Sequence, residues 1–327
     1  MKVGLVGYRC NTGLGELNRQ LFTHQVADCW LVYPHSKVHT VPIPEGETAT
    51  ICYPGDVRKL AKFVTDVDLI LCCELPYFDP LPQLCKAHHR PFVCIPMLEW
   101  LPASPQSWIH RVDLFICPTE HTYNSLHPPL PSALFRWPCD LQRFPFKPRT
   151  TCRRFLFLNG HGGWRGRKGE MVIRRALELW PEMPLTIRSQ VHRTWPDSVR
   201  ILPPTTSNAD LYSEGDVLLL PHRFDGLCLE ALEALTSGLP VISTDGNPWN
   251  EFPSLAKIAA TCQFNAVASD RAIEEYSPSA ESLVESCKQW LGKDISRQSQ
   301  EGRVWAVSRN WENQRATIRN LLQVVCK

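Results

Sequence analysis

The sequence predicts an α/β protein of two domains, each built around a doubly wound parallel sheet. Three observations support this. The chain has 327 residues, which is enough for two domains that each bury a core. Short apolar runs alternate with helical segments along most of its length, as in parallel sheets covered by helices. A proline-rich stretch, residues 137–148, lies near the middle, and we expect the domain boundary near residue 148.

Composition excludes several classes of protein. The formal net charge is +2, with 43% hydrophobic and 21% charged residues, so nothing in the composition demands a polyanionic partner. No apolar run approaches the roughly 18 to 20 residues of a membrane span, and we expect a soluble, cytoplasmic protein. The 14 cysteines form no C-x-x-C pair and lie mostly in apolar runs. We therefore expect buried, reduced thiols and no metal site.

The first domain begins with a predicted strand, residues 1–9, and a glycine loop, residues 11–15. A helix is expected to begin near Glu16. Strand, glycine loop and helix present backbone amides to an anion, and Gly13 and Gly15 are therefore candidate ligand-binding positions. The loop lacks the third glycine of a dinucleotide fingerprint, which disfavours a nicotinamide enzyme.

Four further strands are expected in this domain, at residues 29–33, 68–73, 91–96 and 114–117. Glu74 and Glu99 follow two of them and can reach the carboxyl edge of the sheet, where open α/β sheets bind ligands. Surface exposure explains both acids equally well. His121 follows the strand 114–117, next to the expected helix cap Thr119. Asp66-Val67-Asp68 precedes its strand, so we expect it at the amino edge as a solvated turn.

The second domain restarts with a strand at 154–158 and a loop, residues 159–169, that has five glycines and three cations. A helix is expected at 170–180. Glycines such as Gly162 and Gly163 let the backbone approach a ligand, and Arg165, Arg167 and Lys168 can neutralise a diphosphate. The loop is therefore a candidate diphosphate site.

A βαβ unit follows over residues 216–244, after an expected strand at 185–188 and a further segment that begins at Ile201-Leu202. Its strands are expected at 217–220 and 241–244, and its helix ends at Gly238. Asp225 is expected at the entrance of the helix and Glu233 just over two turns into it, so both acids can border one cleft.

The acid, seven residues and second acid from Asp225 to Glu233, closed by residues 237–242, resemble the donor-site signature of retaining GT-B glycosyltransferases, most closely family 4. The sequence departs from the commonest form by Asp225 in place of Glu and by Leu227 in place of an aromatic residue. A shorter acid reaches less far, which puts the identity of the sugar in doubt more than the activity.

The resemblance implies roles for these residues. Asp225 would bind hydroxyls of the transferred sugar, Glu233 the ribose, and Lys168 with either Arg165 or Arg167 the diphosphate. Segment 201–202 would pass the nucleobase, and the first glycine loop would face the cleft between the domains. The remaining donor-facing positions are on the loop before and at the start of the helix: Gly226, Leu227, Cys228 and Leu229.

The implied fold is GT-B, with two Rossmann-like domains facing a cleft: residues 1–148 on the acceptor side, residues 149–308 for the donor, and a helix in 309–327 that returns to the first domain. The implied enzyme is a retaining hexosyltransferase that uses a nucleotide diphosphate sugar, such as UDP-glucose or a GDP-sugar, with no metal and no tightly bound cofactor. Its acceptor would be a hydroxyl on a sugar, a lipid or hydroxymethylated DNA, with Glu74, Glu99 and His121 as candidates on the acceptor side.

Two alternatives remain open. A phage-type DNA glycosyltransferase could use the cations of 153–154 and 165–168, but the near-neutral net charge argues against strong DNA binding. If the protein were a non-catalytic module that only binds sugar nucleotides, the presence of Asp225 in place of the usual Glu would be explained.

Overall fold

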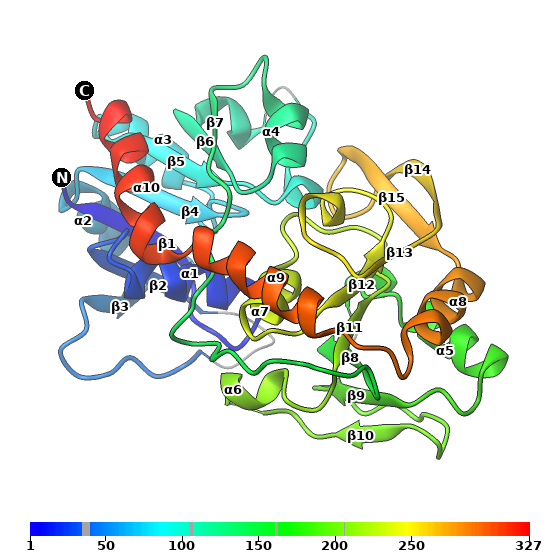
Figure 1. Cartoon of the computed structure of the whole chain (residues 1–327). Coiled ribbons are helices and arrows are strands. Elements are labelled where there is room, and N and C mark those ends of the chain that lie inside the picture. The colour runs from blue at the N-terminus through cyan, green and yellow to red at the C-terminus, as the bar shows by residue number, and fades with distance from the viewer. Residues whose placement is uncertain (35–39, 105–106, 161–162, 206) are drawn as a thin grey trace. The chain divides into compact units, whose positions relative to one another are not determined.

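The computed structural model describes residues 1–34, 40–104, 107–160, 163–205 and 207–327. The chain divides into two compact units (Figure 1). Unit 1 comprises Met1–Trp137, Ala268–Arg271 and Trp311–Lys327, and unit 2 comprises Pro138–Val267 and Ala272–Asn310. Residues 138–148, which the sequence analysis included in the first domain, thus belong to unit 2.

Unit 1 contains a seven-stranded sheet of order β3-β2-β1-β4-β5-β6-β7. Every pairing in it is parallel. The chain moves from β1 outward in one direction and then from β4 outward in the other, so a topological switch point lies between β1 and β4. The strands are β1 (Val3–Tyr8), β2 (Cys29–Tyr33), β3 (Ala49–Ile51), β4 (Leu69–Cys73), β5 (Phe92–Ile95), β6 (Leu114–Cys117) and β7 (Ser132–Leu134).

The central strands of unit 1 are buried because they are apolar on both faces; β4, for example, is buried along its whole length, whereas the edge strands β3 and β7 are only partly buried or exposed. The helices of unit 1 are α1 (Gly13–Thr23), α2 (Val57–Thr65), α3 (Leu81–Ala87), α4 (Glu120–Leu126) and α10 (Trp311–Val325).

Helix α1 begins earlier than the sequence suggested. The segment expected as a loop forms its first turn, because Thr12 caps the helix by accepting a hydrogen bond from the Gly15 amide. Gly15 is required here: a Cβ at this position would lie 2.0 Å from the Cys10 carbonyl oxygen. Both Gly13 and Gly15 are therefore helical residues.

Helix α10 packs within unit 1 through shared indole contacts. Trp137 and Trp311 both donate from Nε1 to Gln20 Oε1, at 2.8 and 3.3 Å, and their rings meet edge to face. At the other end, Arg319 donates to the Met1 carbonyl oxygen. These contacts join the last helix to the N-terminal residue and the first helix of the chain.

Unit 2 contains a six-stranded parallel sheet of order β10-β9-β8-β11-β12-β13. Its switch point lies between β8 and β11. The strands are β8 (Phe155–Gly160), β9 (Leu185–Ser189), β10 (Arg200–Leu202), β11 (Val217–Leu220), β12 (Val241–Thr244) and β13 (Ala256–Ile258). The helices are α5 (Glu170–Leu179), α6 (Asn208–Leu211), α7 (Leu229–Thr236), α8 (Ala280–Trp290) and α9 (Ser296–Ser308).

The core of unit 2 forms where α5 and α8 cover this sheet. Ile173 and Leu177 of α5 and Leu283 of α8 pack against Phe155 and Phe157 of β8, all with at most 3% of their surface exposed. Burial of each such side chain contributes roughly 1.5 to 3 kcal/mol. The helices therefore fix the sheet on which the loops of the candidate site are mounted.

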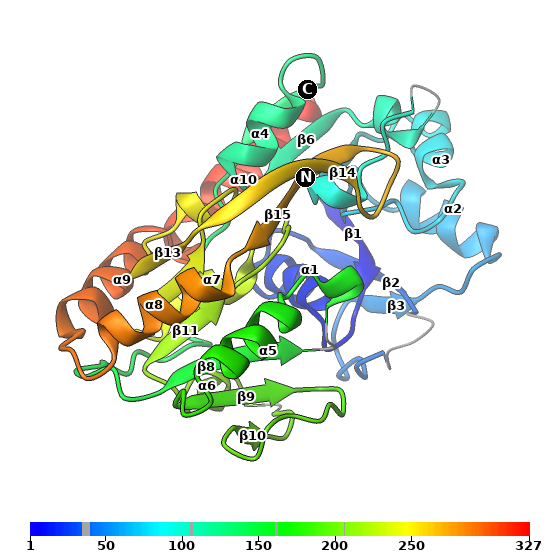
Figure 2. The ribbon, with the colours of Figure 1, turned by 90° about the vertical axis from the view of Figure 1, so that its right-hand side faces the viewer.

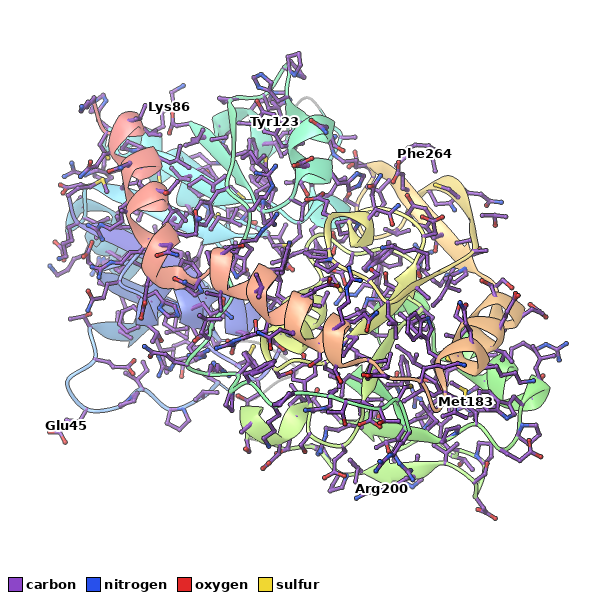
Figure 3. All side chains as sticks on the ribbon, in the orientation of Figure 1. Glu45, Lys86, Tyr123, Met183, Arg200 and Phe264 are labelled. Carbon is purple, nitrogen blue, oxygen red and sulfur yellow. The ribbon has the colours of Figure 1, made fainter. Side chains whose placement is uncertain are left out.

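A hairpin of β14 (Ala260–Ala266) and β15 (Ala272–Pro278) was not expected from the sequence. Figure 2 shows it as a long extended ribbon. Its first strand is largely exposed, and Phe264 projects from it with 70% of its surface accessible (Figure 3).

All 14 cysteines are free, and all but Cys29, Cys262 and Cys326 are buried. Burial raises the pKa of most of these thiols, as expected for small apolar core residues. Within the described ranges of the chain, no helix is both long and apolar enough to cross a membrane.

Candidate active site

Two loops of unit 2 meet at the carboxyl edge of its sheet. One connects β8 to α5 and the other connects β11 to α7, and because β8 and β11 are paired neighbours, the loops lie side by side. Gly169 makes this approach possible. Its φ is +74°, and a Cβ there would lie 1.9 Å from the Pro221 carbonyl oxygen. Only glycine therefore fits where the two loops touch.

The β8–α5 loop has an unusual backbone. Gly163, Gly166 and Gly169 all have positive φ, and so does the non-glycine residue Arg165, at +51°. Left-handed backbone at a non-glycine residue is strained and is concentrated at functional sites. Gly162, a predicted donor-binding residue, lies outside the described residues.

Lys168 is held in a buried ion pair with a residue that the sequence analysis missed. Its Nζ lies 2.6 Å from Glu230 Oε2, and the two side chains expose only 12% and 18% of their surface. Burial alone would raise the pKa of Glu230, but Lys168 and His222 outweigh it and lower that pKa to about 2. Glu230 is thus anionic, and Lys168 already has one carboxylate partner.

His222 lies between two carboxylates and is fully buried. Its Nε2 is 3.2 Å from Glu230 Oε2, and its Nδ1 is 3.4 Å from Asp225 Oδ2. The other oxygen of Asp225 accepts hydrogen bonds from the amides of Leu227 and Cys228, at 3.2 and 2.9 Å. A continuous row of charged or polar groups therefore runs from Lys168 to Asp225.

Asp225 is ionised despite its burial. Desolvation would raise its pKa, but Arg167, His222 and Lys168 together hold the pKa of this carboxyl well below its usual range. The charge of Arg167 is the largest of the three favourable influences. Asp225 and Arg167 therefore belong to the same electrostatic group.

The two arginines of the loop differ in their surroundings. Arg165 donates from Nη1 to the carbonyl oxygens of Ala266 and Val267 and lies over the ring of Trp164. Arg167 accepts at its carbonyl oxygen from the Arg223 amide. The guanidinium of Arg165 is thus directed to the end of β14, whereas that of Arg167 acts on Asp225.

Glu233 is held by a tyrosine that sequence reasoning also missed. The Tyr212 hydroxyl donates to Glu233 Oε2 at 2.6 Å, and Tyr212 is buried. Burial and the neighbouring charge of Glu233 raise the pKa of Tyr212, so it stays a donor. No motif in residues 210–216 marks Tyr212 as a partner of Glu233, because only the fold brings the two side chains together.

Helix α7 begins later than expected, and this moves Glu233. Asp225 caps a turn at residues 227 and 228, and Cys228 has φ +63°, which is not helical. The helix therefore starts at Leu229, and Glu233 lies one turn into it rather than just over two. The backbone amides of Leu227 and Cys228 already donate to Asp225, and both residues are buried.

The predicted base-facing residues lie on the edge strand β10. Ile201 exposes 47% of its surface, and Leu202 is half-buried. An exposed large apolar side chain next to a carboxyl-edge loop is a suitable surface for a flat ring.

In unit 1 the predicted acceptor-side residues lie on different elements. Glu74 directly follows β4 with φ +65°, and Glu99 is almost fully buried in the short 3₁₀ helix Leu98–Trp100 after β5. Because β4 and β5 are paired, both acids lie at one edge of the sheet. His121 lies in α4, after β6.

An aromatic group at the same edge was not predicted. Tyr8 at the end of β1 meets Tyr33 and Tyr77 edge to face or nearly so, with ring centroids 5.7 and 4.8 Å away. Burial raises the pKa of Tyr8 to about 12, and the charge of Glu74 adds to that effect. Tyrosines beside a carboxylate at a switch point form a surface that is suited to a polar, hydroxyl-rich molecule.

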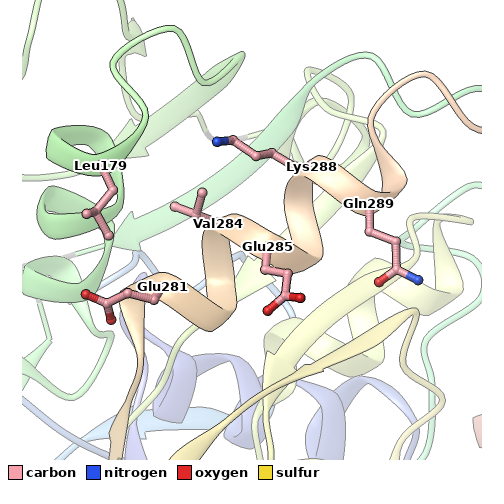
Figure 4. Close-up of a pocket in the computed structure, with 6 residues that line it drawn as sticks. All are labelled: Leu179, Glu281, Val284, Glu285, Lys288 and Gln289. Atoms are coloured by element: carbon pink, nitrogen blue, oxygen red, sulfur yellow. The ribbon is translucent and has the colours of Figure 1, made fainter.

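Two hollows lie among the residues of unit 2 that the structure describes, one beside α5 and one beside the Lys168 loop. The larger, about 570 Å³, lies between α5 and α8 (Figure 4) and is lined by Leu179, Glu281, Val284, Glu285, Lys288 and Gln289. Leu179 is the last residue of α5, whose first turn adjoins the Lys168 loop, so this hollow is at the wrong end of the helix for the charged groups above. The smaller, about 330 Å³, lies beside the Lys168 loop and includes Arg165, Arg223 and Asn265.

Comparison with known proteins relates this arrangement to one class. Residues 181–256 match the family model "Glycosyl transferases group 1". This range contains β9 to β12, the acids Asp225 and Glu233, and Tyr212. None of the curated proteins is similar enough in sequence to be matched to the chain.

Solved structures match over the whole chain. HepE from Anabaena in complex with UDP and glucose has a TM-score of 0.71 at 12% identity, covering 99% of this chain and 100% of that one. Sucrose-phosphate synthase from Thermosynechococcus elongatus has a TM-score of 0.68 at 13% identity, with 99% of each chain covered. The α,α-trehalose 6-phosphate synthase from Burkholderia multivorans has a TM-score of 0.61 at 9% identity, covering 99% and 96%.

The predicted GT-B fold and the resemblance to glycosyltransferases are therefore confirmed: the chain has the fold of these enzymes, and residues 181–256 match group 1. The family match and the fold together support the prediction that the protein is a glycosyltransferase.

Proposed function

We propose that the protein transfers a hexose from a nucleotide diphosphate sugar to an acceptor hydroxyl, with retention of the anomeric configuration. The observation that carries the proposal is the coupling of Asp225 to Arg167 and Lys168 across two touching carboxyl-edge loops. UDP-glucose is the first donor to test, because HepE, which shares the fold, has been solved with UDP-glucose.

Arg167 and Lys168 would bind the donor diphosphate. During transfer the diphosphate leaves with growing negative charge, and fixed cations in a partly buried site stabilise that charge. Lys168 is already paired with Glu230, so the diphosphate would share this lysine with Glu230. Of the two arginines considered from the sequence, we favour Arg167, because Arg165 is bonded to the end of β14.

Asp225 and Glu233 would bind different parts of the donor. Asp225 is ionised and fixed by two backbone amides, and it would accept hydrogen bonds from sugar hydroxyls. Glu233, oriented by Tyr212, would accept from the ribose hydroxyls. Because Oδ1 of Asp225 accepts from the two backbone amides, Oδ2, which lies next to His222, would be the oxygen that binds the sugar.

The reaction proposed here needs no metal ion. The acceptor hydroxyl would attack the anomeric carbon on the face that the diphosphate leaves, as retention requires, and the cations of the loop would supply the charge stabilisation. The acceptor would be a hydroxyl of a sugar or lipid, with Glu74 and the neighbouring tyrosines as its candidate partners in unit 1.

Donor binding and turnover should be measured separately. Calorimetry with UDP, GDP, UDP-glucose and other nucleotide sugars identifies the base and sugar, and release of the nucleotide diphosphate reports turnover with a panel of acceptors. The proposal requires both binding and acceptor-dependent turnover. Binding without turnover for any acceptor would instead support a non-catalytic binding module.

DNA belongs in the acceptor panel. Retention of hydroxymethylated duplex at low salt, lost as salt rises, together with sugar incorporation, would identify a DNA-modifying enzyme. Absence of retention at every salt concentration removes that alternative.

A further inference from the structure

Three potential metal ligands meet where the β11–α7 loop enters the helix. Among the residues that the structure describes, His222, Asp225 and Cys228 are the group whose His, Asp and Cys ligand atoms all lie within 4.8 Å of one another. From His222 Nδ1 the distances are 3.4 Å to Asp225 Oδ2 and 4.0 Å to Cys228 Sγ. We call these three residues the His222 cluster.

The His222 cluster has an electrostatic problem that a cation would solve. Nε2 of His222 faces the Glu230 carboxylate, and Nδ1 faces both a carboxylate oxygen and a sulfur. A neutral imidazole carries one proton, so one of its nitrogens would direct a lone pair at an ionised carboxylate. Either a second proton or a metal ion at Nδ1 removes that repulsion.

The distances fit a metal ion. Tetrahedral zinc with bonds of about 2.0 to 2.3 Å places neighbouring ligand atoms roughly 3.3 to 3.6 Å apart. The nitrogen–oxygen separation already has this value. The sulfur lies 4.0 Å from the nitrogen and within 4.8 Å of the oxygen, so the Cys228 side chain must move by up to about 1 Å to complete the site. The backbone supports the oxygen ligand, because the amides of Leu227 and Cys228 hold Asp225 Oδ1 and leave Oδ2 directed at His222.

The surroundings resemble those that tune metal sites. A metal-bound histidine usually donates its other ring N–H to a carboxylate. Glu230, which is itself held by Lys168, lies 3.2 Å from Nε2, but Nε2 makes no hydrogen bond in this structure, so the imidazole ring must turn slightly to donate to it. His222 exposes none of its surface and Cys228 only 2%. Burial and the nearby carboxylates of Asp225 and Glu230 raise the pKa of the Cys228 thiol well above its usual value, and a bound metal ion displaces the thiol proton.

We propose that His222 Nδ1, Asp225 Oδ2 and Cys228 Sγ bind a divalent ion of intermediate softness such as zinc, and that the bound ion competes with the donor sugar for Asp225. On binding, the thiol loses its proton to solvent and the Sγ–metal bond forms, with no change of oxidation state. The ion, one carboxylate and one thiolate together have no net charge. The competition between the ion and the sugar rests on the proposed function, in which Asp225 binds the sugar. The ion would then be an inhibitor rather than a cofactor.

Cobalt is the probe for the site. The full-length protein is freed of metal by a chelator, which is then removed, and titrated with Co²⁺. Thiolate coordination gives a sulfur-to-cobalt charge-transfer band in the near ultraviolet, and tetrahedral geometry gives strong visible bands. We expect both to saturate at one ion per chain and to be abolished by added Zn²⁺.

Matched variants identify the ligands. Cys228→Ser and Cys228→Ala should both lose the charge-transfer band, whereas Cys262→Ser should keep it, because Cys262 is an exposed thiol on β14. Glu230→Gln should weaken cobalt binding by about 10- to 100-fold while keeping the band, as expected for a group that orients a ligand. Near-ultraviolet circular dichroism checks that each variant is folded.

Two results would overturn the site: a wild-type titration without the band, or a band that survives in both folded Cys228 variants. Competition is tested separately by calorimetry with UDP-glucose and with UDP, each with and without Zn²⁺. We expect zinc to weaken UDP-glucose binding at least tenfold and UDP binding much less. Equal affinity for UDP-glucose with and without zinc would show that the ion does not compete with the sugar for Asp225, but it would leave the metal site itself intact. If UDP-glucose does not bind to the metal-free protein, the proposed donor is wrong instead.

Discussion

The hydroxyl of Tyr212 donates a hydrogen bond to Glu233 Oε2 at 2.6 Å, so the carboxylate proposed to bind ribose is oriented by a buried tyrosine 21 residues before it. Tyr212 is itself fixed, because Phe144 packs edge to face on its ring and Arg149 donates to its carbonyl oxygen. A carboxylate held in this way loses little side-chain entropy when a ligand binds.

Removing this orientation should weaken nucleotide binding. We expect Tyr212→Phe to reduce the affinity for free UDP by about 1 kcal/mol, the scale of one hydrogen bond, and Glu233→Gln to reduce it by about 1.5 to 3 kcal/mol, the scale of a charged one. Calorimetry measures both. Tyr123→Phe in α4 of unit 1 is the control for loss of a phenol, and unchanged UDP affinity in Glu233→Gln would reject the ribose assignment.

Lys168→Ala should lower kcat/KM for donor turnover by roughly two to four orders of magnitude, because one stabiliser of the developing charge is removed. The variant also leaves the buried carboxylate of Glu230 without its cation, which costs stability. The double variant Lys168→Ala/Glu230→Gln should recover stability in thermal unfolding without recovering turnover.

Lys288→Ala on α8 is the matched control for Lys168→Ala, since it removes a lysine of the same unit at the hollow between α5 and α8. It should retain wild-type turnover. If Lys168→Ala is folded and retains wild-type kcat/KM, the lysine does not bind the leaving diphosphate.

The pH dependence of stability should reveal Lys257. Burial lowers the pKa of Lys257 from 10.5 to about 8, and its ammonium donates to the Trp249 carbonyl oxygen and to Ser243. Between pH 8 and 10.5 the unfolded chain therefore binds more protons at this group than the folded chain does. The contribution of Lys257 to folding then becomes more favourable as pH rises through this window, and it is constant below pH 8.

This is measured as a difference from Lys257→Met, because the buried cysteines and tyrosines titrate in the same range. Urea unfolding at several pH values should show the free energy of unfolding of the wild type rising relative to that of the variant from pH 8 to 10.5. A constant difference across this window would mean that the pKa of Lys257 is not lowered.

The sequence predicted the sheets well where strands are short, apolar and bounded by turn residues. The predicted strands 29–33, 114–117, 217–220 and 241–244 agree with β2, β6, β11 and β12 to the residue. The hairpin β14–β15 was missed because its first strand is largely exposed and neither strand has an apolar run to mark it. Its strands are defined by pairing with each other rather than by burial.

The candidate site was predictable only in part. Residues on loops after strands could be placed at the carboxyl edge, because parallel strands bring these loops together. Side-chain pairings could not be predicted: Lys168 and Glu230 are 62 residues apart, and the contact exists because two loops touch at Gly169. The late start of α7 was also hidden, since it depends on Asp225 accepting from two amides and on the left-handed backbone of Cys228. The functional roles of these residues stay predictions.

The last prediction separates the two acids of the signature. If Asp225 meets only the transferred sugar, Asp225→Asn should retain UDP affinity and lose about 1.5 to 3 kcal/mol of UDP-glucose affinity together with transfer. Asp225→Glu introduces the residue that is usual in the family that the sequence resembles. The longer side chain should change the preference among nucleotide sugars rather than abolish activity. Asp225 also pairs with His222, so thermal unfolding must first show that both variants are folded. Calorimetry with UDP and with several nucleotide sugars then gives the comparison. An equal loss of UDP affinity in Asp225→Asn and Glu233→Gln would mean that the acids are not divided between sugar and ribose, and the proposed orientation of the donor would have to be reversed or abandoned.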